Sequence, residues 1–240
     1  MTLAKFKTSL IEAESLLRSF DLLRQKGVKS LNDIGVSNEF KMASQSHDYF
    51  NAYKTGLRHF DYDFLLRDES FFQFEFKPNS NFNGFPDIRY AFFQNPQEYK
   101  TYVEFLAELN LLEGIVNIEE EIGDMFQDAY DQFLIEQQVS LRSVTIRFDT
   151  DFKNYKPLIH SVAHIHIGYN NSIRIPCDKV LTPLNFVVFV LKHTYYNIWR
   201  ELIEKEDKTL LDCISSVKGS CENLENDKWE AKEKNELFIT

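Results

Sequence analysis

The sequence predicts an α+β fold in which a largely antiparallel sheet carries helices packed on one face. Two groups of segments, near residues 62–93 and 144–175, alternate apolar and polar side chains, and segments with helical spacing separate and flank them. Hydrophobic residues make up 43% of the 240 residues, which is enough to form a sizeable core. We therefore expect a single α+β domain over residues 1–205 and a polar C-terminal tail, residues 206–240, that is partly ordered.

The first elements are two predicted helices. Ser9 and Glu12 have the spacing of a capping box, apolar residues recur at helical intervals after them, and Gly27 is a typical helix end, so residues 9–26 are predicted to be helical. A second helix is expected from about Gln45 to Arg58. Both helices precede the first group of strands.

A hairpin and a third strand follow. Alternation over residues 62–66 and 72–76 predicts two strands, and Arg67, Asp68 and Glu69 form the turn between them. Residues 77–87 are rich in Asn, Pro and Gly and are predicted to be a loop, whereas residues 88–93 are predicted to be the third strand.

Two acidic helices are expected after these strands, from about Gln97 to Leu111 and from about Ile118 to Gln137. Carboxylates line the outer face of these helices, including Glu119, Glu120 and Asp124. A metal site built from these carboxylates is one interpretation, and a solvated helix face is the interpretation that we favour.

The second group of strands leads into a helix. Residues 144–148, 158–167 and 172–175 are predicted to be strands, with a turn at residues 169–171. Thr182 and Pro183 have the pattern of an N-cap followed by a first-turn proline, so we expect a helix to about Lys205. Its first two turns, with Phe186 and Phe189, are apolar all round and predict a central buried helix. In the tail we expect a short helix, a weakly ordered end and an optional edge strand at residues 237–239.

The overall charge restricts the classes of function. A net charge of −10 argues against a general nucleic-acid coat, but it permits a local basic site and suits a basic protein partner. The spacing of Cys177, Cys213 and Cys221 is not that of a metal site, so reduced thiols are expected. With neither a signal peptide nor an apolar segment of membrane length in the pattern, we expect a cytoplasmic protein without a membrane partner.

Three of the six histidines fall within seven residues, at His160, His164 and His166. Residues two apart on a strand share a face, so these imidazoles are predicted to project together, away from Ile165 and Ile167. The same parity places three charged side chains of the neighbouring strands on that face, namely Arg147, Asp149 and Arg174.

This set of side chains suggests phosphate chemistry. His164 and His166 could bind a divalent ion (Mn, Mg or Zn) with Asp149 as a further ligand, or the three histidines and Asp149 could act in acid–base catalysis. Arg147 and Arg174 would hold a phosphate. Simple anion binding and an exposed polar sheet face are the alternatives that remain open.

Two local motifs resemble HUH-type endonucleases, which combine a His-hydrophobe-His strand with a tyrosine-bearing helix. The motifs here are the strand with His164 and His166 and the helix with Tyr195 and Tyr196. The resemblance implies that the histidines hold a divalent metal and that one tyrosine attacks a DNA phosphate.

A longer resemblance spans roughly residues 60–200. Five stretches, at residues 88–96, 147–149, 160–168, 174–176 and 182–199, are together similar to an uncharacterised bacterial family, domain of unknown function 2290. The family brings no activity with it. Small bacterial proteins of this kind often lie in mobile or phage-defence gene clusters, which favours a nuclease by association alone.

These observations lead to two functional hypotheses. The first is a nuclease or phosphodiesterase-like effector, of the toxin or phage-defence type, which acts on a nucleic acid or a nucleotide through the His/Arg face. The second is a non-catalytic subunit that binds a protein partner in a bacterial defence or toxin–antitoxin complex. A concave site around the histidines suits the first hypothesis, and a flat open face suits the second.

Overall fold

The computed structural model describes residues 1–28, 35–78, 86–96, 102–115, 117–140, 145–169, 173–236 and 238–239. The chain forms two compact units. The first contains residues 1–95 and 144–240, and the second, residues 96–143, is inserted between two strands of the first.

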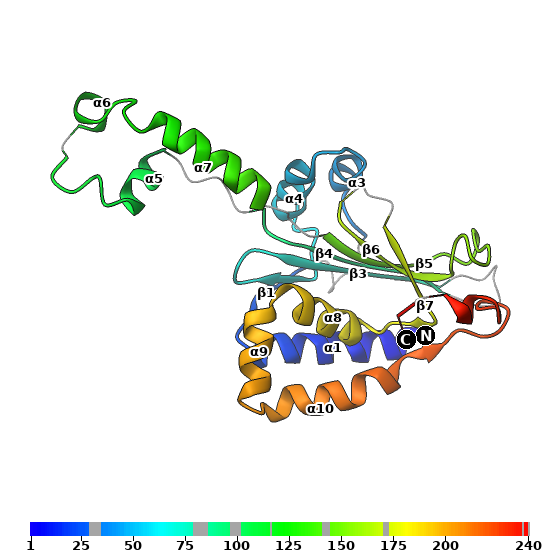
Figure 1. Cartoon of the computed structure of the whole chain (residues 1–240). Coiled ribbons are helices and arrows are strands. Elements are labelled where there is room, and N and C mark those ends of the chain that lie inside the picture. Colours follow the sequence, from blue (N-terminus) through cyan, green and yellow to red (C-terminus); the bar gives the residue numbers. More distant parts are fainter. Residues whose placement is uncertain are drawn as a thin grey trace. The chain divides into compact units, whose positions relative to one another are not determined.

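A sheet of seven strands forms the centre of the first unit (Figure 1). Every strand pairs antiparallel with the next one along the chain, so the sheet is a simple meander. The fold class is α+β with an antiparallel sheet, as the alternation predicts. The strands are β1 (Leu23–Lys26), β2 (Phe64–Leu66), β3 (Phe71–Lys77), β4 (Asp87–Phe93), β5 (Thr145–Thr150), β6 (Ala163–Ile167) and β7 (Arg174–Cys177).

Helices α1 (Leu3–Ser19) and α8 (Pro183–Thr194) pack on one face of this sheet, and α10 (Lys208–Val217) lies on the same side (Figure 1). The predicted central helix is α8, which begins at the predicted cap: the Thr182 hydroxyl accepts a hydrogen bond from the Asn185 amide. Phe186 is fully buried and its ring lies 5.6–6.2 Å from those of three aromatic residues of the sheet, Phe72, Phe74 and Tyr90. Phe189 is only half-buried and packs against His193, so its predicted burial is wrong.

The opposite face also carries helices, at one end. Helices α3 (Asn38–Ser44) and α4 (Tyr49–Arg58) cover a second apolar cluster (Figure 1). Phe71 and Phe93 contribute from the sheet, and Phe40 and Tyr53 contribute from the helices. On the strands beyond this cluster the same face bears polar side chains.

The first predicted helix has the wrong limits. Helix α1 begins at Leu3 with Thr2 as its cap and ends at Ser19, and the chain reverses at Asp21, whose φ is 54°. Ser9 is a buried residue within the helix rather than a cap, and its hydroxyl accepts a hydrogen bond from the Leu184 amide. Residues 23–26 form the edge strand β1.

Gly27 therefore does not end a helix. A Cβ at this position would lie 1.8 Å from the carbonyl oxygen of Tyr62. The amide of Gly27 also donates to the carbonyl of Asp63 at 2.8 Å. Glycine is needed because the backbone of β1 passes very close to the segment before β2.

Two further predicted helices are interrupted. The helix expected over residues 45–58 begins only at Tyr49, because Asp48 caps it by accepting from the Asn51 amide. The helix expected to reach Lys205 breaks at Tyr195, after which α9 (Tyr196–Glu204) begins. The Tyr195 side chain packs on Phe92 and donates to Asp68, which fixes the break.

The described residues of the second unit form the helices α5 (Tyr102–Glu108), α6 (Ile118–Glu121) and α7 (Gln127–Ser140). The single helix expected over residues 118–137 is divided near Gly123, which has a φ of 48°. The Tyr102 hydroxyl holds this break by donating to the Gly123 carbonyl and accepting from the Phe126 amide.

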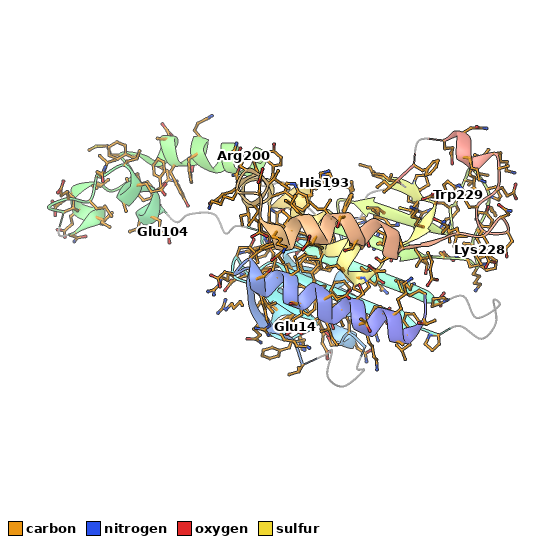
Figure 2. All side chains as sticks on the ribbon, turned by 90° about the horizontal axis from the view of Figure 1, so that it is seen from below. Glu14, Glu104, His193, Arg200, Lys228 and Trp229 are labelled. Carbon is orange, nitrogen blue, oxygen red and sulfur yellow. The ribbon has the colours of Figure 1, made fainter. Side chains whose placement is uncertain are left out.

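The segment after residue 206 contains α10, a turn of 3₁₀-helix (Lys218–Ser220), strand β9 (Glu222–Asn223) and a second 3₁₀ turn (Glu233–Asn235). Strand β9 pairs with β8 (Lys179–Val180). Lys228 and Trp229 lie between β9 and the last turn (Figure 2), and both are buried. Near the end of the chain, Ile239 forms a single bridge with Cys177 at the edge of β7.

Candidate functional site

Polar side chains form two rows across the second face of the sheet. Strand register aligns Arg89, Asp149 and His164 in one row, on β4, β5 and β6. In the next row Arg147 lies opposite His166, and His166 lies opposite Arg174. Arg147, Asp149, His164, His166 and Arg174 therefore share one face, as the alternation predicts.

A groove of about 730 Å³ lies over these rows. Helix α3 contributes Lys41 and Ser44 to its lining, and the segment after β5 contributes Asp151, Lys153 and His160. Among the charged lining residues that the structure describes, the basic ones outnumber the acidic ones, although the chain as a whole has a net charge of −10. The basic residues are Lys41, Lys77, Arg89, Arg147, Lys153 and Arg174, and the acidic residues are Glu75, Asp87, Asp149 and Asp151.

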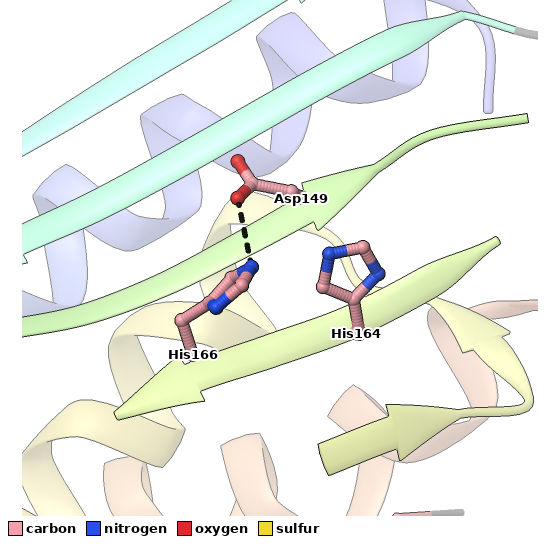
Figure 3. A group of neighbouring side chains, drawn as sticks. All are labelled: Asp149, His164 and His166. Atoms are coloured by element: carbon pink, nitrogen blue, oxygen red, sulfur yellow. Dashed lines mark ion pairs between the residues drawn. The ribbon is translucent and has the colours of Figure 1, made fainter. Parts of the chain in front are cut away.

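Asp149, His164 and His166 converge in the groove (Figure 3). Each offers one ligand atom, and these three atoms lie within 4.8 Å of one another. His166 Nε2 is 3.5 Å from Asp149 Oδ2, and His164 Nδ1 is 3.0 Å from the Ser161 carbonyl oxygen. The Ser161 carbonyl can only accept, so His164 Nδ1 carries a proton and leaves Nε2 with a free lone pair.

Both histidines are buried, with exposed fractions of 2% for His164 and 6% for His166. An exposed polar sheet face is therefore the wrong description of these two residues. Burial lowers the pKa of His164 to about 4, with nearby Arg174 and His160 contributing. Burial, Arg147 and His164 lower the pKa of His166 to about 3. Both imidazoles are neutral at physiological pH.

Asp149 shows the opposite effect of burial, which raises the pKa of its carboxyl group. Three arginines, Arg147, Arg89 and Arg174, oppose that rise through their charge. The net shift is upward, so the folded protein disfavours the charged form of Asp149 relative to water.

The sequence pattern predicts that His160 lies on the strand, and this prediction is wrong. Residues 158–162 precede β6 in a turn in which Leu158 has a φ of 64°, and His160 bridges back to Lys156. The turn nevertheless brings His160 to the groove, where its ring centroid is 5.2 Å from that of His164. His160 Nε2 lies 3.8 Å from Asp151 Oδ2.

The guanidinium groups of Arg89, Arg147 and Arg174 form no hydrogen bond and no ion pair with the residues that the structure describes. Arg89 is absent from the residues predicted for the site. Its position between Ile88 and Tyr90, both buried in the core, is the sequence feature that could have placed it on the polar face.

The structure does not bring the candidate tyrosines to the histidines. Tyr195 packs against Phe92, which belongs to the core on the face opposite His164 and His166. Tyr196 is 60% exposed on α9. The tyrosine nucleophile that a resemblance to HUH endonucleases implies is therefore not part of this groove.

Comparison with known proteins identifies the family. The chain matches the family described as uncharacterized conserved protein (DUF2290) over residues 18–236. It belongs to the DUF2290 family. No curated protein and no solved structure matches the chain. Among the described residues of this DUF2290 protein, no helix combines the length and the apolar character that crossing a membrane requires.

Proposed function

We propose that this DUF2290 protein binds a divalent metal ion at Asp149, His164 and His166 and hydrolyses phosphodiesters as a nuclease. The convergence of these three ligand atoms within 4.8 Å supports the proposal most directly. Two histidines and one carboxylate are a common ligand set for catalytic metals, and they leave coordination positions open for water and substrate.

The state of the ligands suits a metal. Neutral imidazoles bind metal ions without first losing a proton, and both histidines are neutral above about pH 5 because their pKa values are about 4 and about 3. The hydrogen bond from His164 Nδ1 to Ser161 is the outer contact that typically orients a metal-binding imidazole. A ligand set with two nitrogens favours Mn or Zn over Mg.

The arginines suit a substrate that contains phosphate. Within the described residues, the three guanidinium groups form no ion pair at contact distance, and the carboxylate on which their charges act is that of Asp149, the carboxylate of the proposed ligand set. Arginine is well suited to grip phosphate oxygens with two parallel hydrogen bonds. A bound phosphate would compensate the charge of the metal and of the arginines at the same time.

Hydrolysis adds one water molecule across a P–O bond. The water oxygen joins phosphorus, the bond from phosphorus to one sugar oxygen breaks, and that oxygen takes up a proton. When bound, the metal would supply Lewis-acid activation of the phosphate and the water. His160, beside the Asp151 carboxylate, is the residue that we assign to proton transfer.

The test begins with protein stripped of metal by EDTA. Mn²⁺, Zn²⁺ and Mg²⁺ are titrated by calorimetry, and hydrolysis of RNA, DNA and bis(p-nitrophenyl) phosphate is then measured with each ion. His164→Gln and His166→Gln should each lose metal affinity and about 10²-fold or more of the hydrolysis rate. His59→Gln, which changes an exposed histidine outside the groove, should retain both.

Absence of stoichiometric metal binding, or equal activity in all three variants, would reject the proposed function. An effector role is a separate step of the proposal. If it holds, expression of the wild-type chain should slow bacterial growth and expression of the His166→Gln variant should not.

Protein binding is the second function that we propose, because the inserted unit is acidic and exposes apolar side chains. Residues 96–143 contain eleven acidic and two basic residues. Val103, Leu109 and Met125 of this unit are 47–73% exposed. A basic protein partner would complement this surface, and its association would weaken with salt, without any hydrolysis that depends on metal.

A further inference from the structure

We infer that the substrate is a single nucleic-acid strand that crosses β4 to β7 and binds by phosphates on both sides of the cleaved bond. The inference deepens the proposed nuclease function and rests on it. It derives from where the three arginines lie relative to Asp149, His164 and His166.

Two of the arginines flank the metal ligands. Arg89 lies on β4 and Arg174 on β7, whereas the ligands lie on the two strands between them. Neighbouring strands are about 4.8 Å apart, so three spacings separate the backbones of Arg89 and Arg174 by roughly 14 Å. A phosphate at the centre can meet the metal and Arg147, and the phosphates on either side of it would extend toward Arg89 and Arg174.

The arginines of the groove are also open to a ligand. Elsewhere in the chain Arg18, Arg24 and Arg67 each contact a carboxylate oxygen, at 2.8, 2.7 and 2.5 Å respectively. In the groove, Glu75 lies opposite Arg89 in the strand register, yet its carboxylate pairs with Lys77 at 2.7 Å. Arg89 and Arg174 are exposed and remain available to an anion that enters the groove.

The depth of the ligands favours a single strand over a duplex. With exposures of 2% and 6%, His164 and His166 are the deeply buried part of a groove whose lining also includes α3 and the segment of residues 151–160. A phosphate must enter this groove to reach the buried ligands. A single strand can bend its backbone into such a groove, whereas a duplex holds its phosphates on the surface of a wide, stiff cylinder.

The experiment separates contacts at the centre from contacts with the flanking phosphates. Wild-type protein, Arg89→Ala and Arg174→Ala are loaded with Mn²⁺ and assayed on bis(p-nitrophenyl) phosphate and on labelled strands of about 4 and about 12 nucleotides. Arg58→Ala, at an exposed arginine outside the groove, is the matched control.

We expect kcat/KM to rise with strand length in the wild type. Each groove variant should lose about tenfold or more of kcat/KM on the longer strand and a clearly smaller factor on bis(p-nitrophenyl) phosphate, which has no flanking phosphates. Anisotropy of the longer strand in EDTA should show weaker binding for both variants, with a salt dependence reduced by about one phosphate contact each.

A kcat/KM that does not change with strand length would overturn the inference, and so would equal losses of kcat/KM on the strand and on bis(p-nitrophenyl) phosphate. Neither result would contradict the proposed nuclease function. Cleavage of duplex as efficient as that of single strands would overturn it too. If no substrate is hydrolysed, the proposed function fails. The anisotropy measurement then decides the inference by itself: binding that the two arginine variants do not weaken would refute it.

Discussion

Acidification should destabilise the metal-free protein through its two buried histidines. The pKa of His164 is about 4 and that of His166 is about 3 in the folded protein, against an ordinary value of 6.5. Between those values the unfolded chain binds protons that the folded protein does not. The free energy of unfolding must therefore fall as the pH drops from about 6.5, and it stops falling only below the folded pKa values.

The size of the effect follows from these pKa values. About pH 5 is about 1.5 units below the pKa of a histidine in the unfolded chain, so the unfolded histidines are protonated. The two folded histidines are still mostly neutral at this pH. At about 1.36 kcal/mol per unit, each histidine lowers the free energy of unfolding by about 2 kcal/mol. Asp149 acts in the opposite direction because its raised pKa lets the folded protein gain a proton as the pH falls. About 4 kcal/mol is therefore the upper limit for the decrease in unfolding free energy that His164, His166 and Asp149 cause together.

Urea unfolding in EDTA, followed by the fluorescence of Trp199 and Trp229, measures this free energy between about pH 7 and about pH 5. The double variant His164→Gln/His166→Gln should show a shallower pH dependence than the wild type, and the difference is the contribution of the two imidazoles. His59→Gln should follow the wild type. Parallel pH profiles for the wild type and the double variant would refute the buried, neutral state of these histidines.

Two packing predictions concern the frame that carries the groove. Phe186→Ala should lower the free energy of unfolding by about 3–5 kcal/mol because Phe186 is fully buried. Phe189→Ala should lower it much less because Phe189 is half-buried. Thermal melting of the two variants measures the difference. Gly27→Ala places a methyl group 1.8 Å from a carbonyl oxygen and should reduce the melting temperature, whereas Gly35→Ala meets nothing within 4 Å and should not. Equal melting temperatures within either pair would contradict the packing described for it.

Much of the sheet could be predicted from local alternation. Residues 72–76 and 144–148 alternate strictly, and a strand with one apolar face needs no information from elsewhere in the chain to reveal its parity. The same parity predicts that His164, His166 and Asp149 share one face. Because the meander pairs each strand with its neighbour in sequence, these faces also line up in space.

Other features depend on contacts that are distant in sequence. Residues 23–26 have helical spacing, but they become a strand because β2 offers a free edge to them. The burial of His164 and His166 depends on surrounding elements, and the groove above them is lined by α3 and by the segment after β5. His160 reaches the groove through a turn with a positive φ, which no alternation pattern contains.

Asp149 offers a way to separate a functional face from a structural one. A structural carboxylate is normally paired so that folding lowers its pKa, whereas folding raises the pKa of Asp149. A raised pKa means that the charged carboxylate destabilises the folded state throughout the range above about pH 4, including neutral pH. Proteins commonly accept this cost where a charged group is needed to bind a ligand.

Asp149→Asn should therefore leave the metal-free protein at least as stable as the wild type at neutral pH, because the neutral amide removes the buried charge while nearly preserving the shape. The same variant should lose metal affinity and hydrolysis, because an amide is a much weaker ligand than a carboxylate. Urea unfolding in EDTA and calorimetry with Mn²⁺ measure the two effects separately. A loss of stability above about 1 kcal/mol, with metal affinity unchanged, would show that Asp149 supports the fold through its charge and that the ligand lies elsewhere.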